Sequence, residues 1–171
     1  MKTNIALIGF MGTGKTSVGK VLSRKLKMKL VRTDDLIVSL AGKSIPEIFE
    51  QDGEQRFREL EVDVIKRISD EKEVVIDCGG GVILNKINMN LLKKKAKIIL
   101  LTASPEVLLE RVSIDNEERP LLNTKDRFDR IRKILAFREP LYRKFADFEI
   151  NTSNLEIDQV VDKILEFLRK K

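Results

Sequence analysis

The residues best suited to chemistry lie near the start of the chain, where positions 9–16 read GFMGTGKT. This stretch fits the pattern G-x-x-x-x-G-K-[ST], in which glycines let backbone N–H groups converge on an anion. Lys15 can reach the β- and γ-phosphates of a nucleotide, and the Thr16 hydroxyl can bind Mg²⁺. An apolar run precedes the stretch and helical periodicity follows it, as such a loop requires. The sequence therefore predicts a nucleoside-triphosphate site.

Acidic residues follow two later apolar runs, where they could complete a site for phosphoryl transfer. Asp34 and Asp35 come directly after the second run, and we interpret Asp34 as the carboxylate that takes or orients the proton of an acceptor. Either aspartate could instead cap the helix that follows. Asp77 ends the run Val-Val-Ile-Asp, which resembles a Walker B strand, so it could hold Mg²⁺ or bond local backbone.

A glycine triplet and two arginines could form the acceptor side of the site. Gly79-Gly80-Gly81 exposes backbone N–H groups and lets a ligand approach closely. Arg58 and Arg138 could bind a carboxylate through bidentate hydrogen bonds. From spacing alone, Arg58 could equally pair with Glu54 on a helix surface, and Arg138 could be a cation near a helix break at Pro140.

The elements that must position these residues form a regular α/β pattern. Apolar runs predict five strands, at 4–10, 29–33, 74–78, 97–103 and 148–152, with helical patterns between them. We expect a three-layer α/β/α architecture with a five-stranded parallel sheet, in which ligands bind at the carboxyl ends of the strands. Residues 1–171 should form a single kinase domain, with an acceptor-binding insertion at about 34–72 and a lid at about 113–127.

Composition excludes several other classes of protein. The 33 Lys and Arg against 27 Asp and Glu give a net charge of +6, which favours anionic partners, but the basic residues are spread along the chain rather than clustered for nucleic acid. One cysteine and no histidine argue against a disulfide or a zinc site. No apolar stretch is long enough to span a membrane, so we expect a cytoplasmic protein without membrane or nucleic-acid partners.

With these residues assembled, the chain resembles shikimate kinase, a P-loop family of the nucleoside-monophosphate-kinase type, from end to end. The matching segments agree in order, spacing and content, and are 9–16 (GFMGTGKT), 33–34 (TD), 45–49 (IPEIF), 52–61 (DGEQRFRELE), 79–81 (GGG), 119–122 (RPLL) and 138–142 (REPLY).

This resemblance implies ATP- and Mg²⁺-dependent phosphorylation of the 3-hydroxyl of shikimate, which gives shikimate 3-phosphate and ADP for aromatic amino-acid biosynthesis. We expect the protein to be a monomer. It implies that Asp34 accepts the hydroxyl proton, while Lys15 and Arg119 act on the transferring phosphate. The residues implied to bind ATP are Gly12, Thr13, Gly14, Lys15, Thr16, Ser17, Arg111, Arg119, Thr152, Ser153 and Asn154. Those implied to bind shikimate are Asp34, Arg58, Gly79, Gly80, Gly81 and Arg138.

One position departs from the family pattern, which usually reads Asp-Thr-Asp at the end of the second strand. The first of these aspartates helps to hold the waters of Mg²⁺, and here the position is Arg32. Because a guanidinium aimed at the metal is repelled by it, Arg32 should point away or lie against phosphate oxygens. We expect Asp77, together with Thr16, to take the metal role.

Three other functions can be weighed against this interpretation. A kinase of the same fold could act on another hydroxy acid such as gluconate. A GTPase-like switch would fit D-x-x-G at 77–80, but the near match to N-K-x-D at 85–88 ends in Asn and follows too soon. A nucleic-acid-dependent ATPase would need an aromatic platform, which one Tyr and eight mostly periodic Phe do not offer.

Overall fold

A parallel sheet forms the centre of the computed structural model, which describes residues 3–114, 122 and 126–170. Within this described part, five strands pair in the order β2-β3-β1-β4-β5. Their bounds are β1 (Asn4–Ile8), β2 (Lys29–Arg32), β3 (Val74–Asp77), β4 (Ala96–Thr102) and β5 (Phe148–Asn151). Every pairing is parallel, so the carboxyl ends of the strands lie at one edge of the sheet.

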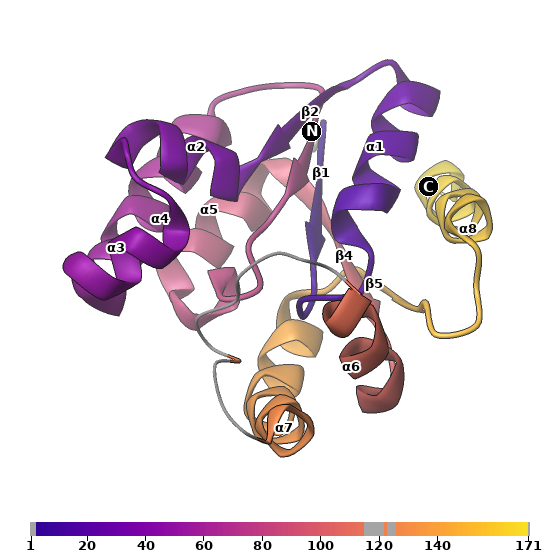
Figure 1. Cartoon of the computed structure of the whole chain (residues 1–171). Helices are drawn as coiled ribbons and strands as arrows, with labels where there is room; N and C mark the ends of the chain where they lie inside the picture. Colours follow the sequence, from indigo (N-terminus) through magenta and orange to yellow (C-terminus); the bar gives the residue numbers. More distant parts are fainter. Residues whose placement is uncertain (1–2, 115–121, 123–125, 171) are drawn as a thin grey trace.

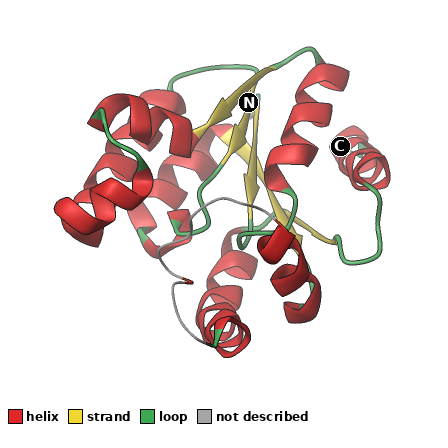
Figure 2. Ribbon diagram, viewed as in Figure 1, coloured by secondary structure: helices red, strands yellow, loops and turns green. Residues whose placement is uncertain are grey.

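Helices cover both faces of this sheet (Figures 1 and 2). Their bounds are α1 (Lys15–Leu26), α2 (Thr33–Ala41), α3 (Ile45–Gln51), α4 (Gly53–Ser69), η1 (Val82–Leu84), α5 (Lys86–Lys95), α6 (Pro105–Ile114), α7 (Arg127–Phe145) and α8 (Ile157–Arg169). The helices α1 and α8 lie on one face, and α4, α5 and α7 lie on the other. The predicted three-layer α/β/α architecture is confirmed.

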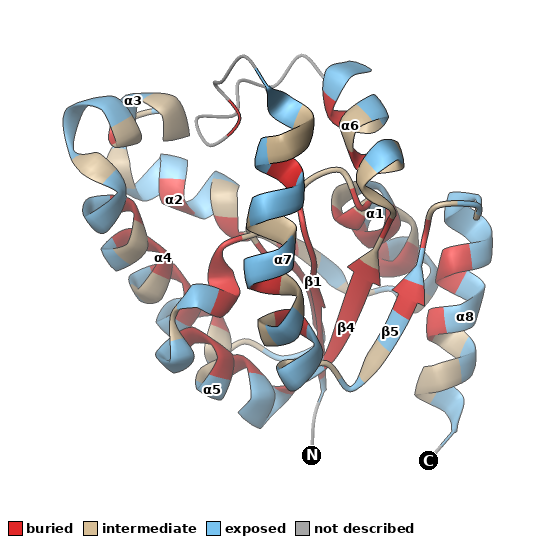
Figure 3. Ribbon diagram, turned by 90° about the horizontal axis from the view of Figure 1, so that it is seen from below, coloured by how far each residue is buried: buried red, intermediate tan, exposed pale blue. Residues whose placement is uncertain are grey.

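The core is divided by the sheet into two apolar layers. Ile5 and Leu7 of β1 face α1 and α8, whereas Ala6 and Ile8 face α4 and α5. All five residues of β1 are buried, as expected for a parallel strand that is covered on both sides. Figure 3 shows β1 and β4 as buried between helices whose outer faces are exposed.

Three helices, α2 to α4, occupy the insertion predicted at about 34–72, a segment that the structure describes in full. The apolar stripe along α4 turns inward, because Phe57, Leu60 and Val64 pack against Ile37 of α2 and Ile48 of α3. Ser44 starts α3 with a capping box: its hydroxyl accepts from the Glu47 N–H, and the Glu47 carboxylate accepts from the Ser44 N–H. The insertion is therefore a packed helical unit beside the sheet.

Several predicted boundaries are wrong by one or two residues, because polar or glycine residues end each strand early. The five strands end at 8, 32, 77, 102 and 151 rather than at 10, 33, 78, 103 and 152, and β4 begins at 96 rather than 97. Arg32 occupies the N-cap position of α2, so neither Asp34 nor Asp35 is the cap; both lie in its first turn, where their charge suits the helix dipole. The helix break at Pro140, considered above as the alternative for Arg138, is absent, since α7 continues through it.

The segment predicted as a lid, 113–127, is described only at Ser113, Ile114, Leu122, Asp126 and Arg127. Leu122 is buried with Phe10 and Leu108. Arg119 lies outside the described residues. After this segment α7 begins at Arg127, and Asp126 is its N-cap residue, whose carboxylate accepts from the Asp129 N–H.

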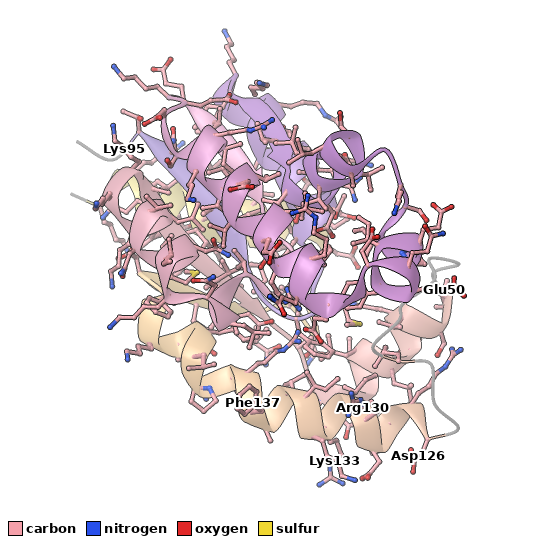
Figure 4. The ribbon with its side chains drawn as sticks, turned by 90° about the vertical axis from the view of Figure 1, so that its left-hand side faces the viewer. Glu50, Lys95, Asp126, Arg130, Lys133 and Phe137 are labelled. Atoms are coloured by element: carbon pink, nitrogen blue, oxygen red, sulfur yellow. The ribbon has the colours of Figure 1, made fainter. Side chains whose placement is uncertain are left out.

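Figure 4 shows Lys133 on the outer side of α7, where it points away from the rest of the molecule, and Phe137 of the same helix is also exposed. Arg138, the residue after Phe137, is buried. In the described part of the chain, no helix combines the length and the low polarity that a membrane crossing needs.

Candidate active site

The predicted phosphate-binding loop lies between the end of β1 and the start of α1. Gly9, Gly12 and Gly14 have φ angles of 143°, 79° and 92°, in a region that side chains rarely adopt. At Gly9 a Cβ atom would also lie 2.2 Å from the carbonyl oxygen of Leu101, so this position admits only glycine. The turn that glycine allows brings the loop over the edge of the sheet.

Lys15 folds back across this loop instead of extending into solvent. Its Nζ atom donates to the carbonyl oxygens of Gly9 and Phe10, each at 2.9 Å, and the side chain is buried. The Thr13 hydroxyl also donates to the Phe10 carbonyl, at 2.8 Å. The ammonium group is therefore held over the loop, where it can meet phosphate oxygens as a point charge.

A cavity of about 800 Å³ opens in front of the loop and gathers most of the predicted residues. Its lining includes the loop residues Gly12, Thr13, Gly14, Lys15, Thr16 and Ser17, the strand-end residues Arg32, Asp34, Asp77, Gly79 and Gly80, and, on a third side, Arg111, Thr152, Ser153 and Asn154. Segments far apart in sequence thus form one site at the carboxyl edge of the sheet, as the prediction required.

Arg111 and Thr152 tie the side of the cavity assigned to adenine to the phosphate loop. Arg111 of α6 donates to the carbonyl oxygen of Gly12 at 3.2 Å, to the Thr152 hydroxyl at 3.0 Å and to the Thr152 carbonyl at 2.9 Å. The Thr152 hydroxyl in turn donates to the Thr13 carbonyl at 3.1 Å. Both residues therefore fix the loop in addition to lining the cavity.

Asp34 lies beside Gly79, with its Oδ1 atom buried and without a hydrogen-bond partner among the described residues. A Cβ atom at Gly79 would come within 2.7 Å of this oxygen, so glycine is needed there. The loop is fixed by Thr33, whose hydroxyl accepts from the Gly79 N–H at 2.9 Å. Burial raises the pKa of Asp34, and the positive charge of Lys15 opposes this rise. Such a carboxylate is suited to accept a proton.

Asp77 lies between the phosphate loop and Arg32, as the sequence predicts. In the sheet it pairs with Leu7 of β1 on one side and with Arg32 of β2 on the other. Its Oδ2 atom accepts from the Thr16 hydroxyl at 2.7 Å and lies 3.5 Å from Arg32 Nε. Arg32 Nη1 also donates to the Asp35 carboxylate, at 3.0 Å and 3.2 Å.

The oxygens of Thr16 and Asp77 suit a Mg²⁺ ion that keeps most of its contacts with phosphates and water. Among the described residues, no group of three or more His, Cys, Asp or Glu side chains could hold a metal on its own. A hydroxyl beside one carboxylate fits the P-loop arrangement, in which the nucleotide supplies further ligands.

On the acceptor side, Arg58 makes the ion pair with Glu54 that spacing allowed, at 3.0 Å, and a second one with Glu61, at 3.3 Å. Its guanidinium also lies against the glycine triplet, because a Cβ atom at Gly81 would be 2.2 Å from Nη1. Arg58 therefore makes the ion pair with Glu54 and also lies on the acceptor side of the site.

Arg138 reaches the same triplet from α7. Its Nη1 atom donates to the carbonyl oxygen of Gly80 at 3.4 Å, and the Tyr142 hydroxyl donates to that oxygen as well. Burial raises the pKa of Tyr142 to about 12, so its hydroxyl keeps its proton and remains a donor. The two guanidinium groups thus converge on adjacent glycines, beside Asp34.

Glu61 is a residue of this site that the sequence analysis missed. It is buried, contacts Arg58 and accepts from Asn88 Nδ2 at 3.4 Å. Burial raises its pKa to about 7, against the opposing effect of Arg58. The signal was present in the sequence, because an acid one turn after Arg58 interrupts an apolar helix face.

We expect Glu61→Gln to remove a pH dependence of folding. Because the folded-state pKa of Glu61 is about 7 and the reference value is 4.5, its contribution to stability is full below pH 4.5 and is lost as the pH rises to about 7. The free energy of unfolding of the wild type, relative to the variant, should fall by about 3 kcal/mol over this interval. Urea melts at several pH values measure it. Glu59→Gln, at an exposed position of the same helix, should show no such trend, and a pH-independent difference for Glu61→Gln would contradict the expectation.

Comparison with known proteins places the chain in a family. The family model described as shikimate kinase matches residues 11–169. Shikimate kinases of Caldanaerobacter subterraneus subsp. tengcongensis and Thermodesulfovibrio yellowstonii are 46% and 47% identical, over 95% of this chain and 94% and 93% of their own lengths. The solved structure of Acinetobacter baumannii shikimate kinase in complex with shikimate has a TM-score of 0.94 at 33% identity, covering 100% of this chain and 97% of that one. The corresponding values for the Aquifex aeolicus enzyme are 0.80 and 36%, with 96% and 95% covered. The chain belongs to the shikimate kinase family.

Proposed function

We propose that this protein transfers the γ-phosphoryl group of ATP to the 3-hydroxyl of shikimate, giving shikimate 3-phosphate and ADP. The observation that carries the proposal is the convergence of Asp34, Arg58 and Arg138 on the glycine triplet, which adjoins the phosphate loop. Family membership supports the same reaction.

The acceptor is held by groups that suit a small hydroxy acid. Arg58 and Arg138 grip the carboxylate, because two guanidinium groups offer several fixed donors to two oxygens. Backbone groups of Gly79–Gly81 contact the ring hydroxyls, since no side chains keep the ligand away. Asp34 Oδ1 accepts the proton of the attacking hydroxyl and orients its oxygen toward the γ-phosphorus.

The nucleotide is held by the other half of the cavity. The N–H groups of Gly12–Thr16 and the start of α1 bind the phosphates, and Ser17 extends this contact by one residue. Arg111 and the Thr152–Asn154 turn hold adenine. Lys15 neutralises charge on the β- and γ-phosphates as the bond breaks. Arg119 lies outside the described residues, and its action on the transferring phosphate remains a prediction, as does the monomeric state.

Thr16 and Asp77 would hold Mg²⁺, which when bound neutralises phosphate charge. The hydrogen bond between Thr16 and Asp77 brings both oxygens to one point beside the loop, which supports this assignment.

A coupled assay of ADP release tests the proposal, with shikimate, gluconate or no acceptor, each with and without Mg²⁺. We expect release that requires both shikimate and Mg²⁺. Release of ADP with gluconate but not with shikimate would show that the protein phosphorylates another acceptor. A requirement for GTP or for a polynucleotide would instead support the switch or the nucleic-acid ATPase.

Arg58→Ala should raise KM for shikimate by about 10- to 150-fold, because it removes a charge-assisted hydrogen bond worth about 1.5–3 kcal/mol. The KM for ATP should change little, since Arg58 lies on the acceptor side of the site. Arg56→Ala is the matched control, because Arg56 makes an exposed ion pair with Glu59 on the same helix. An unchanged KM for shikimate in the Arg58 variant would contradict the assigned role.

A further inference from the structure

An arginine in front of the phosphate loop is the least expected feature of the cavity. Arg32 lines the same space as Lys15 and Thr16, beside the point at which a divalent cation would accompany the nucleotide. A cation there requires negative or neutral oxygens, and the guanidinium brings a permanent positive charge instead.

Arg32 contacts the carboxylate oxygen that the cation would use. The Thr16 hydroxyl and Arg32 Nε both meet Asp77 Oδ2, at 2.7 Å and 3.5 Å. Asp77 is buried, so its charge is little screened by solvent. A divalent cation near Thr16 and the Arg32 guanidinium therefore compete for one anionic group.

The position of Arg32 is fixed from the far end of its side chain. Its Nη1 atom donates to both oxygens of Asp35, which is exposed in the first turn of α2. Its Nε atom is buried and lies 3.5 Å from Asp77 Oδ2 without forming a hydrogen bond, so the guanidinium acts on this carboxylate through its charge.

We propose that Arg32 makes nucleotide binding less dependent on the divalent cation. The inference rests on the proposed function, because it takes the cavity to be the ATP site. With the cation absent, Arg32 supplies positive charge near the phosphates. With the cation present, Arg32 weakens its hold on Asp77. Both effects reduce the thermodynamic coupling between nucleotide and cation, and this coupling is reciprocal.

Calorimetric titration of the full chain with ADP, in excess MgCl₂ and in EDTA, measures this coupling without catalysis. The quantity compared is the ratio of the Kd for ADP without Mg²⁺ to the Kd with Mg²⁺. Arg32→Gln should increase this ratio by about tenfold, within the usual range of coupling between two sites. Arg32→Lys retains the charge and should leave the ratio near that of the wild type.

Two controls separate this effect from general changes of charge and fold. Arg143→Gln removes the same charge from an exposed ion-paired position on α7 and should leave the ratio unchanged. In an Asp77→Asn background, Arg32→Gln should increase the ratio less than it does in the wild-type background, because the competition for the shared carboxylate is gone and only the charge of Arg32 near the phosphates is lost. Thermal melts confirm that each variant is folded.

The outcomes separate the inference from the proposed function. If ADP still binds but the Kd ratio of Arg32→Gln stays within twofold of the wild-type ratio, the role of Arg32 is overturned. The same holds if Arg143→Gln increases the Kd ratio as much as Arg32→Gln does. If the wild type fails to bind ADP even with Mg²⁺, the proposed function fails as well. A tenfold increase that Asp77→Asn suppresses establishes the competition.

Discussion

Replacement of Asp34 by Asn is expected to lower kcat by about 10²- to 10⁴-fold, the usual contribution of a general base. The amide keeps the size of the carboxylate and should fit beside Gly79, where only a small clearance exists. It cannot accept a proton from the attacking hydroxyl. Steady-state kinetics with saturating shikimate, ATP and Mg²⁺ measure the loss, which should fall on kcat rather than on the KM for ATP.

The pH profile gives this prediction a second readout. Because burial raises the pKa of Asp34, activity of the wild type should fall on the acid side at a higher pH than an ordinary aspartate would cause. The Asn variant should lose this acid limb. Asp63→Asn, at an exposed position on α4 paired with Lys66, is the matched control and should retain wild-type kinetics. A kcat within threefold of the wild type in Asp34→Asn would remove Asp34 from the mechanism.

Local sequence was sufficient to predict the phosphate loop, because each of its requirements is a property of neighbouring residues. The positive φ angles of Gly9, Gly12 and Gly14 need glycine wherever the loop occurs. Strands were equally evident, since parallel strands buried on both sides consist of continuous apolar residues. Their ends were less evident, because a residue such as Thr33 can end a strand or begin a helix, and here it does the latter.

Contacts between distant segments could not be read from the residues alone. Asp34 and Asp35 are adjacent and identical, yet one lies beside Gly79 with a buried oxygen and the other binds Arg32 in solvent. The two side chains differ only because the orientation of α2 turns Asp34 toward Gly79 and Asp35 toward solvent. Likewise, nothing near Arg111 indicates that it donates to Gly12 and Thr152, because α6 must first pack behind the loop. The family resemblance supplied these assignments where spacing could not.

Lys15→Met is expected to lower kcat/KM by about 10²- to 10³-fold, the scale for loss of one fixed donor to transition-state charge. Methionine keeps a long apolar side chain in the buried position of Lys15 but removes the ammonium group. It also removes two hydrogen bonds, to the carbonyls of Gly9 and Phe10, so unfolding should become easier by about 1–2 kcal/mol. Thermal melts and steady-state kinetics measure the two effects separately.

Lys15→Met should also raise the pKa of Asp34 further. This shift distinguishes loss of the Lys15 charge from damage to the phosphate loop. Burial is the main cause of the raised pKa of Asp34, and the charge of Lys15 opposes it. Without that charge the ionised carboxylate is less favoured, so the acid limb of the residual activity should move to higher pH. Lys20→Met, on the exposed side of the same helix, should change neither the rate nor the pH profile.

Shikimate binding without nucleotide should persist in Lys15→Met, because Arg58 and Arg138 remain. A large loss of shikimate affinity, or an acid limb that stays in place, would mean that Lys15 supports the loop rather than the charge balance of the site.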